Sequence, residues 1–494
     1  MNVLIVDAGT SSMRGVLMNE EAEVLFQTRK RYHPEFCSAV KVIQNPLVWK
    51  KALTEIGTEV QEWAGMNQKS IDAVSLTAQR TSVMLTDQDG NAITDAVMWQ
   101  DKRNLQLCRE LRERNKEIIE RSGNTINPVF SGSKIAWLRQ EMPEAYDQAE
   151  KVLTVSDYLL YQMTGNFRSD RTYASRSHLM NLRTGRWDPV LLEIFDVEEN
   201  KLCELIEPGE KHGTLTRRFS TETGIPEGIS VYSPGGDQQC ASLGMGILKE
   251  GNLEITSGTG AFIAGITKKL PDIFQGNAIL NYGAIPGTYI VEASILTCSA
   301  AFDWFCKNFY KEPDGIHYER INREIEDSPP GANGCMLLPF FQGRSTPLWN
   351  PEATASFTNV TLSTTRGDMA RALLEGIACE IRNNIDVVEA QTGRAEHIFI
   401  GGGLSRSHPF NQIQADVYER QLFHYSNSES AALGAWISTA VSAGVCASYE
   451  EAFRKARCGD NIIEYEPKEE NMAVYREMRS RMNQMYQKIY DKNK

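Results

Sequence analysis

The sequence lacks a long apolar run and an excess of positive charge. No part of its 494 residues approaches the about 20 uninterrupted apolar residues that a membrane helix needs, because glycine and serine interrupt even the stretch 431–446. The formal net charge is −12, whereas nucleic acids and anionic membranes bind proteins through concentrated positive charge. We therefore expect neither a nucleic acid nor a membrane as a partner.

The sequence also lacks the pattern of a disulfide framework or a zinc site. Its ten cysteines include no Cys-x-x-Cys pair, and its seven histidines include no His-x-x-x-His pair. Cysteines scattered in this way are typical of reduced thiols. They favour a cytoplasmic protein without a structural metal ion.

Several well-known nucleotide-binding fingerprints are missing. The phosphate loop Gly-x4-Gly-Lys-Ser/Thr and a Gly-x-Gly-x-x-Gly turn after a strand do not occur, and neither do the protein-kinase signatures. A Walker-type NTPase, a Rossmann dehydrogenase and a protein kinase are therefore disfavoured.

A strand, a turn rich in glycine and threonine, and a second strand occur twice in the chain. The first copy begins with the apolar run 2–6 and turns at 8–10, and the second begins at 252–256 and turns at 257–260. The copies lie almost half a chain apart, so the sequence predicts an internal duplication.

The length of the chain agrees with this duplication, because 494 residues are too many for one compact core. We expect an α/β protein with two similar lobes and a cleft between them. The boundary is predicted near 244–251, which gives an N-terminal lobe of residues 1–245 and a C-terminal lobe of residues 246–494.

The remaining segments alternate between helical and strand-like patterns. Helices are predicted at 46–64, 365–392 and 472–490 from their apolar periodicity. Strands are predicted at 71–76 and 398–400. Polar residues follow the first of these strands at 77–80, and the end of a buried strand is where an open α/β sheet places its ligands.

The first turn has the chemistry of a phosphate site. Segment 7–14 combines a carboxylate, a glycine, three hydroxyl side chains and a cation. Such a turn can cradle phosphate oxygens, with Asp7 placed to hold Mg²⁺ directly or through water. The same composition also suits an ordinary β-turn. The second copy at 257–260 favours the phosphate site, because two facing hairpins can clamp the β- and γ-phosphates of one nucleotide.

Segment 234–239 is a second chemical centre, where two glycines precede a carboxylate and an amide. Asp237 could accept the proton of an attacking hydroxyl, and Gln238 could hydrogen-bond a neighbouring hydroxyl. The alternative is that Asp237 only caps the following helix or occupies its first turn, which acidic residues favour.

Two further segments carry groups suited to ligands. Gln79, Arg80 and, across a predicted hairpin, Trp99 would supply an amide, a cation and an aromatic wall for a polyol, although a tryptophan is more often a core residue. The glycines 401–403, between a strand and a helix, could let an adenine lie against bare backbone or form a simple tight turn.

Taken together, these segments resemble the FGGY family of carbohydrate kinases over nearly the whole chain, and glycerol kinases in particular. The matching segments are 7–14, 96–100, 130–134, 170–176, 236–239, 257–262, 400–403 and 410–416. The resemblance implies an actin-like ATPase fold of two ribonuclease-H-like lobes. It also implies ATP and Mg²⁺ in the cleft and direct transfer of the γ-phosphoryl group to a sugar or polyol.

The resemblance assigns roles to individual residues. Asp237 matches the general base, and Asp7 stands at the metal. Positions that contact the nucleotide are matched by Thr10, Ser11, Ser12, Arg14, Thr259, Gly402, Gly403 and Ser407. The substrate pocket is matched by Gln79, Arg80, Trp99, Gln238 and Phe262. By family habit the protein would be a homodimer.

Two departures from glycerol kinases concern the substrate. Glycerol kinases follow the Arg80 position with a glutamate that binds glycerol, and this chain has Thr81. They place a tyrosine before the Phe-Ser-Gly segment, and this chain has Val129. Because sites built to hydrogen-bond a particular hydroxyl discriminate strongly, a ketose, pentulose or longer polyol is the expected substrate, with glycerol as the alternative.

Two other functions share this fold. An ATP-driven switch like actin or the heat-shock chaperones would bind protein partners, but the polar and aromatic set of Arg80, Trp99 and Gln238 favours a kinase. A catalytically silent sugar sensor ought to have lost Asp7, Asp237 or Thr259, and all three are present.

Overall fold

The computed structural model describes residues 1–312, 314–427 and 429–490. The chain folds into two compact units that are interleaved along the sequence. The first unit contains Met1–Leu248, Lys268–Ile290 and Glu429–Gly459, and the second contains the rest of the described chain. The lobe limits 1–245 and 246–494 stay a prediction.

The first unit is built on a six-stranded sheet with the order β14-β15-β6-β1-β2-β3. Strand β1 pairs antiparallel with β2 and parallel with β6, and β15 pairs parallel with β6. The strand, turn and strand predicted for the start of the chain are confirmed, and β2 continues the antiparallel pairing to β3. The strands are β1 (Val3–Ala8), β2 (Ser12–Met18), β3 (Val24–Arg31), β6 (Ala73–Ala78), β14 (Lys211–Thr214) and β15 (Ser230–Tyr232).

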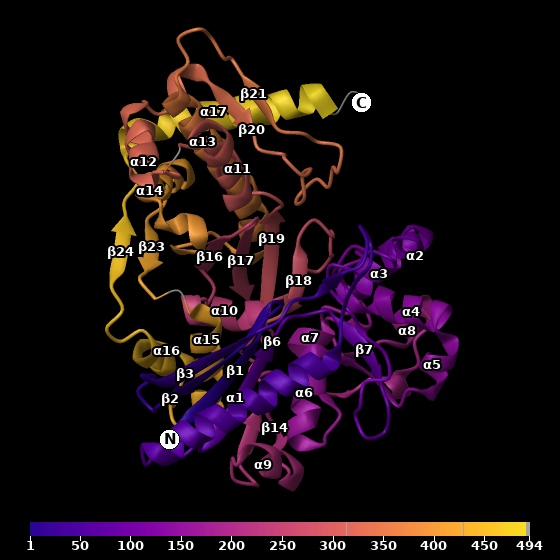
Figure 1. Ribbon diagram of the computed structural model, residues 1–494. Helices are drawn as coiled ribbons and strands as arrows, with labels where there is room; N and C mark the ends of the chain where they lie inside the picture. Colours follow the sequence, from indigo (N-terminus) through magenta and orange to yellow (C-terminus); the bar gives the residue numbers. More distant parts are fainter. Residues whose placement is uncertain (313, 428, 491–494) are drawn as a thin grey trace. The chain divides into compact units, whose positions relative to one another are not determined.

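Helices cover both faces of this sheet. Successive side chains of β1 alternate between two cores, with Leu4 and Val6 in one and Val3 and Ile5 in the other, as the two-residue period of a strand requires. Helices α1 (Pro46–Met66) and α6 (Val155–Thr164) pack on the first face (Figure 1), and α15 (Ser430–Ser442) packs on the second. A strand buried on both faces explains the uninterrupted apolar run at the N-terminus.

Helix α10 (Asp237–Met245) packs against α15 through two glycines. A Cβ atom on Gly244 would lie 2.0 Å from the carbonyl oxygen of Ser430, and one on Gly434 would lie 1.7 Å from that of Cys240. The two backbones therefore touch without side chains between them. This contact fixes the helix that begins at Asp237.

The first unit also contains a five-stranded sheet of order β4-β5-β8-β7-β9, in which β4 is Glu35–Phe36, β5 is Val42–Gln44 and β9 is Lys151–Thr154. Strands β7 (Val83–Thr86) and β8 (Ala96–Val97) pair antiparallel, which confirms the hairpin predicted between Arg80 and Trp99. The sheet shares a core with α4 (Ser131–Glu141) and α8 (Pro189–Phe195).

The second unit repeats the pairing pattern of the first. Strand β16 (Asn252–Ser257) pairs antiparallel with β17 (Ala261–Thr267) and parallel with β22 (His397–Gly401), as β1 does with β2 and β6. The predicted repeat is confirmed at this level. The sheet continues through β23 (Leu422–Tyr425) and β24 (Ile462–Tyr465).

The long helix of the second unit is α13 (Arg366–Thr392), which packs on β17. Thr365 caps its start, because its hydroxyl accepts a hydrogen bond from Asp368 N while the Asp368 carboxylate accepts one from Thr365 N. Helix α17 (Glu469–Tyr490) matches the helix predicted at 472–490, and α14 (His408–Tyr418) is the helix expected after the glycines 401–403. Among the described residues, no helix is both long and apolar enough to cross a bilayer.

The α10–α15 contact generates a stability prediction. Gly434→Ala should lower the free energy of unfolding by about 2 kcal/mol, because its methyl group must displace the backbone of Cys240. Gly65→Ala is the matched control, since a Cβ there meets no atom within 4 Å, and alanine in a helix should add about 0.5–1 kcal/mol. Urea denaturation of both variants measures the difference, and equal midpoints would contradict the close contact.

Candidate active site

The turn between β1 and β2 is braced on both sides of its tip. Gly9 N donates to Ser12 O at 3.0 Å, and the Tyr32 hydroxyl donates to Gly9 O at 2.8 Å. Tyr32 N donates to Ser11 O at 3.0 Å. The backbone of the predicted phosphate turn is therefore held by the neighbouring strand, with Thr10 and Ser11 at its tip.

Arg14 lies between two carboxylates of the first unit. It is the cross-strand partner of Asp7, and its Nη2 atom lies 3.4 Å from Asp7 Oδ2. Its Nη1 atom forms an ion pair with Glu429. Burial raises the pKa of Asp7, and the Arg14 guanidinium opposes that shift. Sequence reasoning missed Glu429, which is 415 residues from Arg14 and belongs to no motif.

The predicted acceptor groups join the phosphate turn directly. Gln79 N donates to Ala8 O at 2.9 Å, and Gln79 Nε2 donates to Gly9 O at 3.3 Å. The Trp99 indole N–H donates to the Thr10 hydroxyl at 3.1 Å. Because 38% of Trp99 is exposed, the alternative that it is a core residue is wrong.

Arg80 and Asp237 form a largely buried ion pair, with Arg80 Nε 3.5 Å from Asp237 Oδ1. Arg80 Nη1 also donates to Gln239 Oε1 at 3.2 Å. Asp237 is the first residue of α10, after the N-cap Gly236, and accepts a hydrogen bond from Gln238 N at 2.7 Å. It therefore occupies the first turn, as the alternative proposed, and it also has a cationic partner. Sequence reasoning missed the hydrogen bond of Gln239 with Arg80. The contact of Gln238 with the substrate stays a prediction.

The two glycines before Asp237 make room for Arg80. Gly235 has a φ of 118°, which favours glycine. A Cβ on Gly236 would lie 2.8 Å from Arg80 Cδ and 2.8 Å from Gln239 Oε1. The arginine stem therefore lies directly against a bare backbone.

Thr81 adopts a strained conformation directly after Arg80. Its φ of 69° is in the left-handed region, which a β-branched residue rarely adopts, and its side chain is buried. The other departure, Val129, lies beside the fully buried Lys134, whose Nζ donates to Val129 O and Pro128 O at 2.6 Å each. Burial lowers the pKa of Lys134 to about 7.

The second unit brings its own predicted residues together. Thr259 lies in the turn between β16 and β17, and its carbonyl oxygen accepts a hydrogen bond from Cys298 N at 2.7 Å. Gly402 has a φ of 90°, and a Cβ there would lie 2.5 Å from Ser257 O. The β16–β17 turn and the glycine turn after β22 are therefore in backbone contact.

The backbone of the glycine turn is uncovered at Gly403. A Cβ atom added there would have the Ser299 hydroxyl, 4.0 Å away, as its nearest neighbour. Ser407 precedes α14, and its hydroxyl donates to Asn322 Oδ1 at 3.2 Å. Phe262, on β17, is 45% exposed, so it is not a core residue. These features suit a flat ring, but the contacts of an adenine remain a prediction.

The chain is similar to known proteins over most of its length. Residues 2–244 match the N-terminal domain model of the FGGY family of carbohydrate kinases, and residues 253–443 match its C-terminal domain model. A glycerol kinase of Alkalilimnicola ehrlichii is 32% identical over 451 residues, which are 88% of each chain. A xylulose kinase of Lactococcus lactis is 24% identical over 490 residues, 98% of this chain and 96% of that one.

Solved structures share the fold. The xylulose kinase from Rhodospirillum rubrum has a TM-score of 0.93 at 22% identity over 99% of each chain. Plasmodium falciparum glycerol kinase with ADP has a TM-score of 0.89 at 23% identity over 98% of each chain. At these identities the likeness shows the fold alone, and the predicted actin-like ATPase fold is confirmed.

The strain at Thr81 can be measured by a pair of substitutions. Thr81→Gly should be more stable than Thr81→Ala by about 1 kcal/mol, because both remove the side chain and only glycine tolerates the left-handed φ. The neighbouring Ser82, whose φ is not positive, is the control, and there alanine should be the more stable by about 0.5 kcal/mol. Chemical denaturation measures the stability of the four variants. If the same residue, glycine or alanine, gives the more stable protein at both positions, the backbone at Thr81 is not strained.

Proposed function

Since this chain belongs to the FGGY family of carbohydrate kinases, we propose that it phosphorylates a ketose, a pentulose or a longer polyol in preference to glycerol. The family transfers a phosphoryl group to an alcohol of a small carbohydrate. The observation that carries the choice of acceptor is Thr81, an uncharged side chain buried next to Arg80 where the resemblance to glycerol kinases expects a glutamate. Glycerol is the second candidate, because a glycerol kinase is 32% identical to this chain.

On the acceptor side, we assign Asp237 as the general base. It would take the proton of the acceptor hydroxyl as that hydroxyl attacks the γ-phosphorus. The Arg80 ion pair orients its carboxylate. The exposed Trp99, which donates a hydrogen bond to Thr10, is proposed as an apolar wall for the acceptor. Gln79, Gln238 and Phe262 are proposed as further contacts of the acceptor.

On the nucleotide side, ATP is the substrate that the family implies. We assign its phosphates to the braced β1–β2 turn with Thr10, Ser11, Ser12 and Arg14, and to Thr259 of the β16–β17 turn. The adenine is assigned to Gly402, Gly403 and Ser407. Support comes from the backbone contact of the Gly402 turn with Ser257 and from the bare face at Gly403.

Asp7 fits a magnesium ion that binds together with ATP. Carboxylate oxygens are ligands that Mg²⁺ prefers, and Asp7 stands at the base of the phosphate turn, next to Arg14. Bound Mg²⁺ would neutralise the charge that develops on the phosphate oxygens. Asp7 would hold the ion directly or through water.

The family models favour a kinase over the protein-binding switch, which shares only the fold. A cytoplasmic location, a homodimer and the lack of nucleic-acid partners remain predictions.

A substrate panel tests the proposed acceptor. ADP release should be measured with ATP and Mg²⁺ for glycerol, tetritols, pentitols, pentuloses, 6-deoxy-ketohexoses and dihydroxypentanedione. We expect kcat/KM for one longer acceptor to exceed that for glycerol at least 100-fold, about 3 kcal/mol of discrimination. Thr81→Glu should raise kcat/KM for glycerol relative to that for the longer acceptor. Thr81→Gln, which has a side chain of similar size without the charge, is the control. Glycerol as the best substrate of the natural chain would overturn the proposal.

The role of Asp237 has its own test. Asp237→Asn should fold and bind ATP with unchanged affinity but lower kcat about 10²- to 10⁴-fold, the usual contribution of a general base. ATP binding is followed by calorimetry and kcat by ADP release on the preferred acceptor. Near-normal kcat in this variant would remove Asp237 as the base.

A further inference from the structure

A buried motif of the first unit, residues 170–176, forms hydrogen bonds with the turn that precedes Asp237. Asp170 caps the short helix α7 (Arg171–Ala174) and is completely buried. Its Oδ1 atom accepts hydrogen bonds from Thr172 N at 2.9 Å and from the Thr172 hydroxyl. Its Oδ2 atom accepts one from the Ser233 hydroxyl. The orientation of the Thr172 hydroxyl is therefore fixed by a carboxylate.

The Thr172 hydroxyl in turn holds the residue before Asp237. It accepts a hydrogen bond from Gly236 N at 2.8 Å, and no part of Thr172 is exposed. Since Gly236 has no side chain that could be held by packing, hydrogen bonds to its backbone are what fix its position. Loss of this acceptor would leave a buried N–H group without its bond.

Tyr173 joins the same turn to the strand that leads to Arg80. Its hydroxyl oxygen accepts a hydrogen bond from Ala78 N at 2.9 Å and lies 3.3 Å from both Ala78 O and Gly235 O. The Thr77 hydroxyl donates to Gly235 O at 2.8 Å. The end of β6 and the Gly235–Gly236 turn are thus tied together two residues before Arg80 and two before Asp237.

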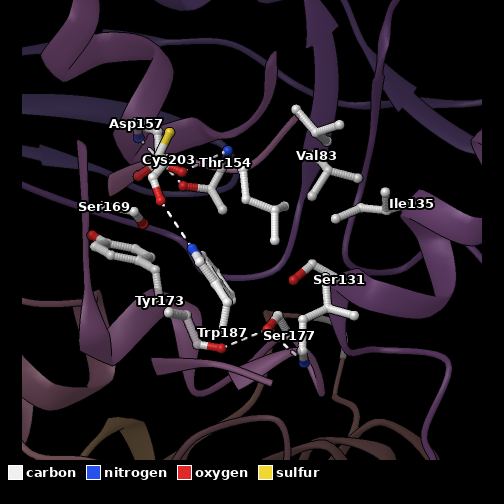
Figure 2. Close-up of a pocket in the computed structure, with 14 residues that line it drawn as sticks. Val83, Ser131, Ile135, Thr154, Asp157, Ser169, Tyr173, Ser177, Trp187 and Cys203 are labelled. Atoms are coloured by element: carbon white, nitrogen blue, oxygen red, sulfur yellow. Dashed lines mark hydrogen bonds between the residues drawn. The ribbon is translucent and has the colours of Figure 1, made fainter. Parts of the chain in front are cut away.

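A small cavity lies beside Tyr173, with a volume of about 30 Å³. Figure 2 shows Tyr173 among its lining residues, together with Ser169, Asp157 and Trp187. A void provides no packing partners on that side of the side chain. The hydrogen bonds of the Tyr173 hydroxyl therefore add to the packing that holds this buried side chain.

We propose that Thr172 and Tyr173 are positioning residues that hold the Asp237 carboxylate, against its ion-pair partner Arg80, in the arrangement needed for phosphoryl transfer. The proposal rests on the proposed role of Asp237 as the base. Among the described hydrogen bonds and ion pairs, neither residue contacts Asp237 or Arg80 directly. Each acts through the backbone next to them, where a displacement of about 1 Å can cost 100-fold in rate.

The test compares isosteric variants in the full-length chain. Thr172→Val and Tyr173→Phe remove one hydroxyl each, and both should lower kcat at least ten-fold with less than a two-fold change in the dissociation constant of ATP. Thr172→Ser keeps the hydroxyl and should restore most of kcat. Thr223→Val and Tyr146→Phe are the controls, because they remove buried hydroxyls of the same unit that bond none of these groups and should change kcat less than two-fold.

A double-mutant comparison separates positioning from general damage. In the Asp237→Asn background, Thr172→Val and Tyr173→Phe should lower the residual rate by less than two-fold, because residues that act through one group are not additive. Thermal unfolding of all variants should be followed alongside. If Thr172→Val does not fold, Tyr173→Phe with its Tyr146→Phe control decides.

The outcomes distinguish this inference from the proposed function. An inactive Asp237→Asn with fully active Tyr173→Phe and Thr172→Val overturns the positioning role and leaves the base in place. The positioning role is also overturned if Thr172→Val and Tyr173→Phe lower kcat of Asp237→Asn by the same factor as they lower kcat of the natural chain. The two hydroxyls would then act independently of Asp237. An active Asp237→Asn overturns the base and the positioning role together.

Discussion

The parallel pairing of β1, β6 and β15 determines where the phosphate turn, Arg80 and Asp237 lie in the first unit. Ala8 is in register with Ala78, and Tyr232 with Ser75, so the three strands end at the same edge of the sheet. The carboxyl ends of parallel strands are where open α/β sheets bind ligands. The phosphate turn follows β1, Arg80 follows β6, and the glycine turn before Asp237 follows β15. Three segments distant in sequence therefore meet because of one register.

Local signals were sufficient for the elements of this fold. The turn at Gly9 and its copy at Gly258, the helix capped by Thr365 and the helix that starts at Asp237 each depend on residues close together in the chain. Glycine and threonine mark the turns, and apolar periodicity marks the helices. For the same reason the repeated hairpin could be recognised, since strand, turn and strand lie within about 15 residues.

The contacts that orient the site could not be found in this way. Glu429 reaches Arg14 because α15 packs on β1, and Gln239 accepts a hydrogen bond from Arg80, which is 159 residues away in the sequence. The exposure of Trp99 depends on the five-stranded sheet, whose strands come from segments distant in the sequence. Sequence patterns identify which residue types are present in a site, but direction and partner come from packing between distant segments.

The strain at Thr81 follows from the same long-range contacts. A β-branched residue keeps a left-handed φ only where its surroundings determine the backbone more strongly than its own preference. Here Gln79 is bonded to β1, Ala78 to Tyr173, and Arg80 to Asp237 and Gln239. These hydrogen bonds and this ion pair fix residues 78–80, which directly precede Thr81 in the loop. A rigid loop cannot adapt to acceptors of different length, so under the proposed function the choice of acceptor would depend on which side chain stands at position 81 and where the loop holds it.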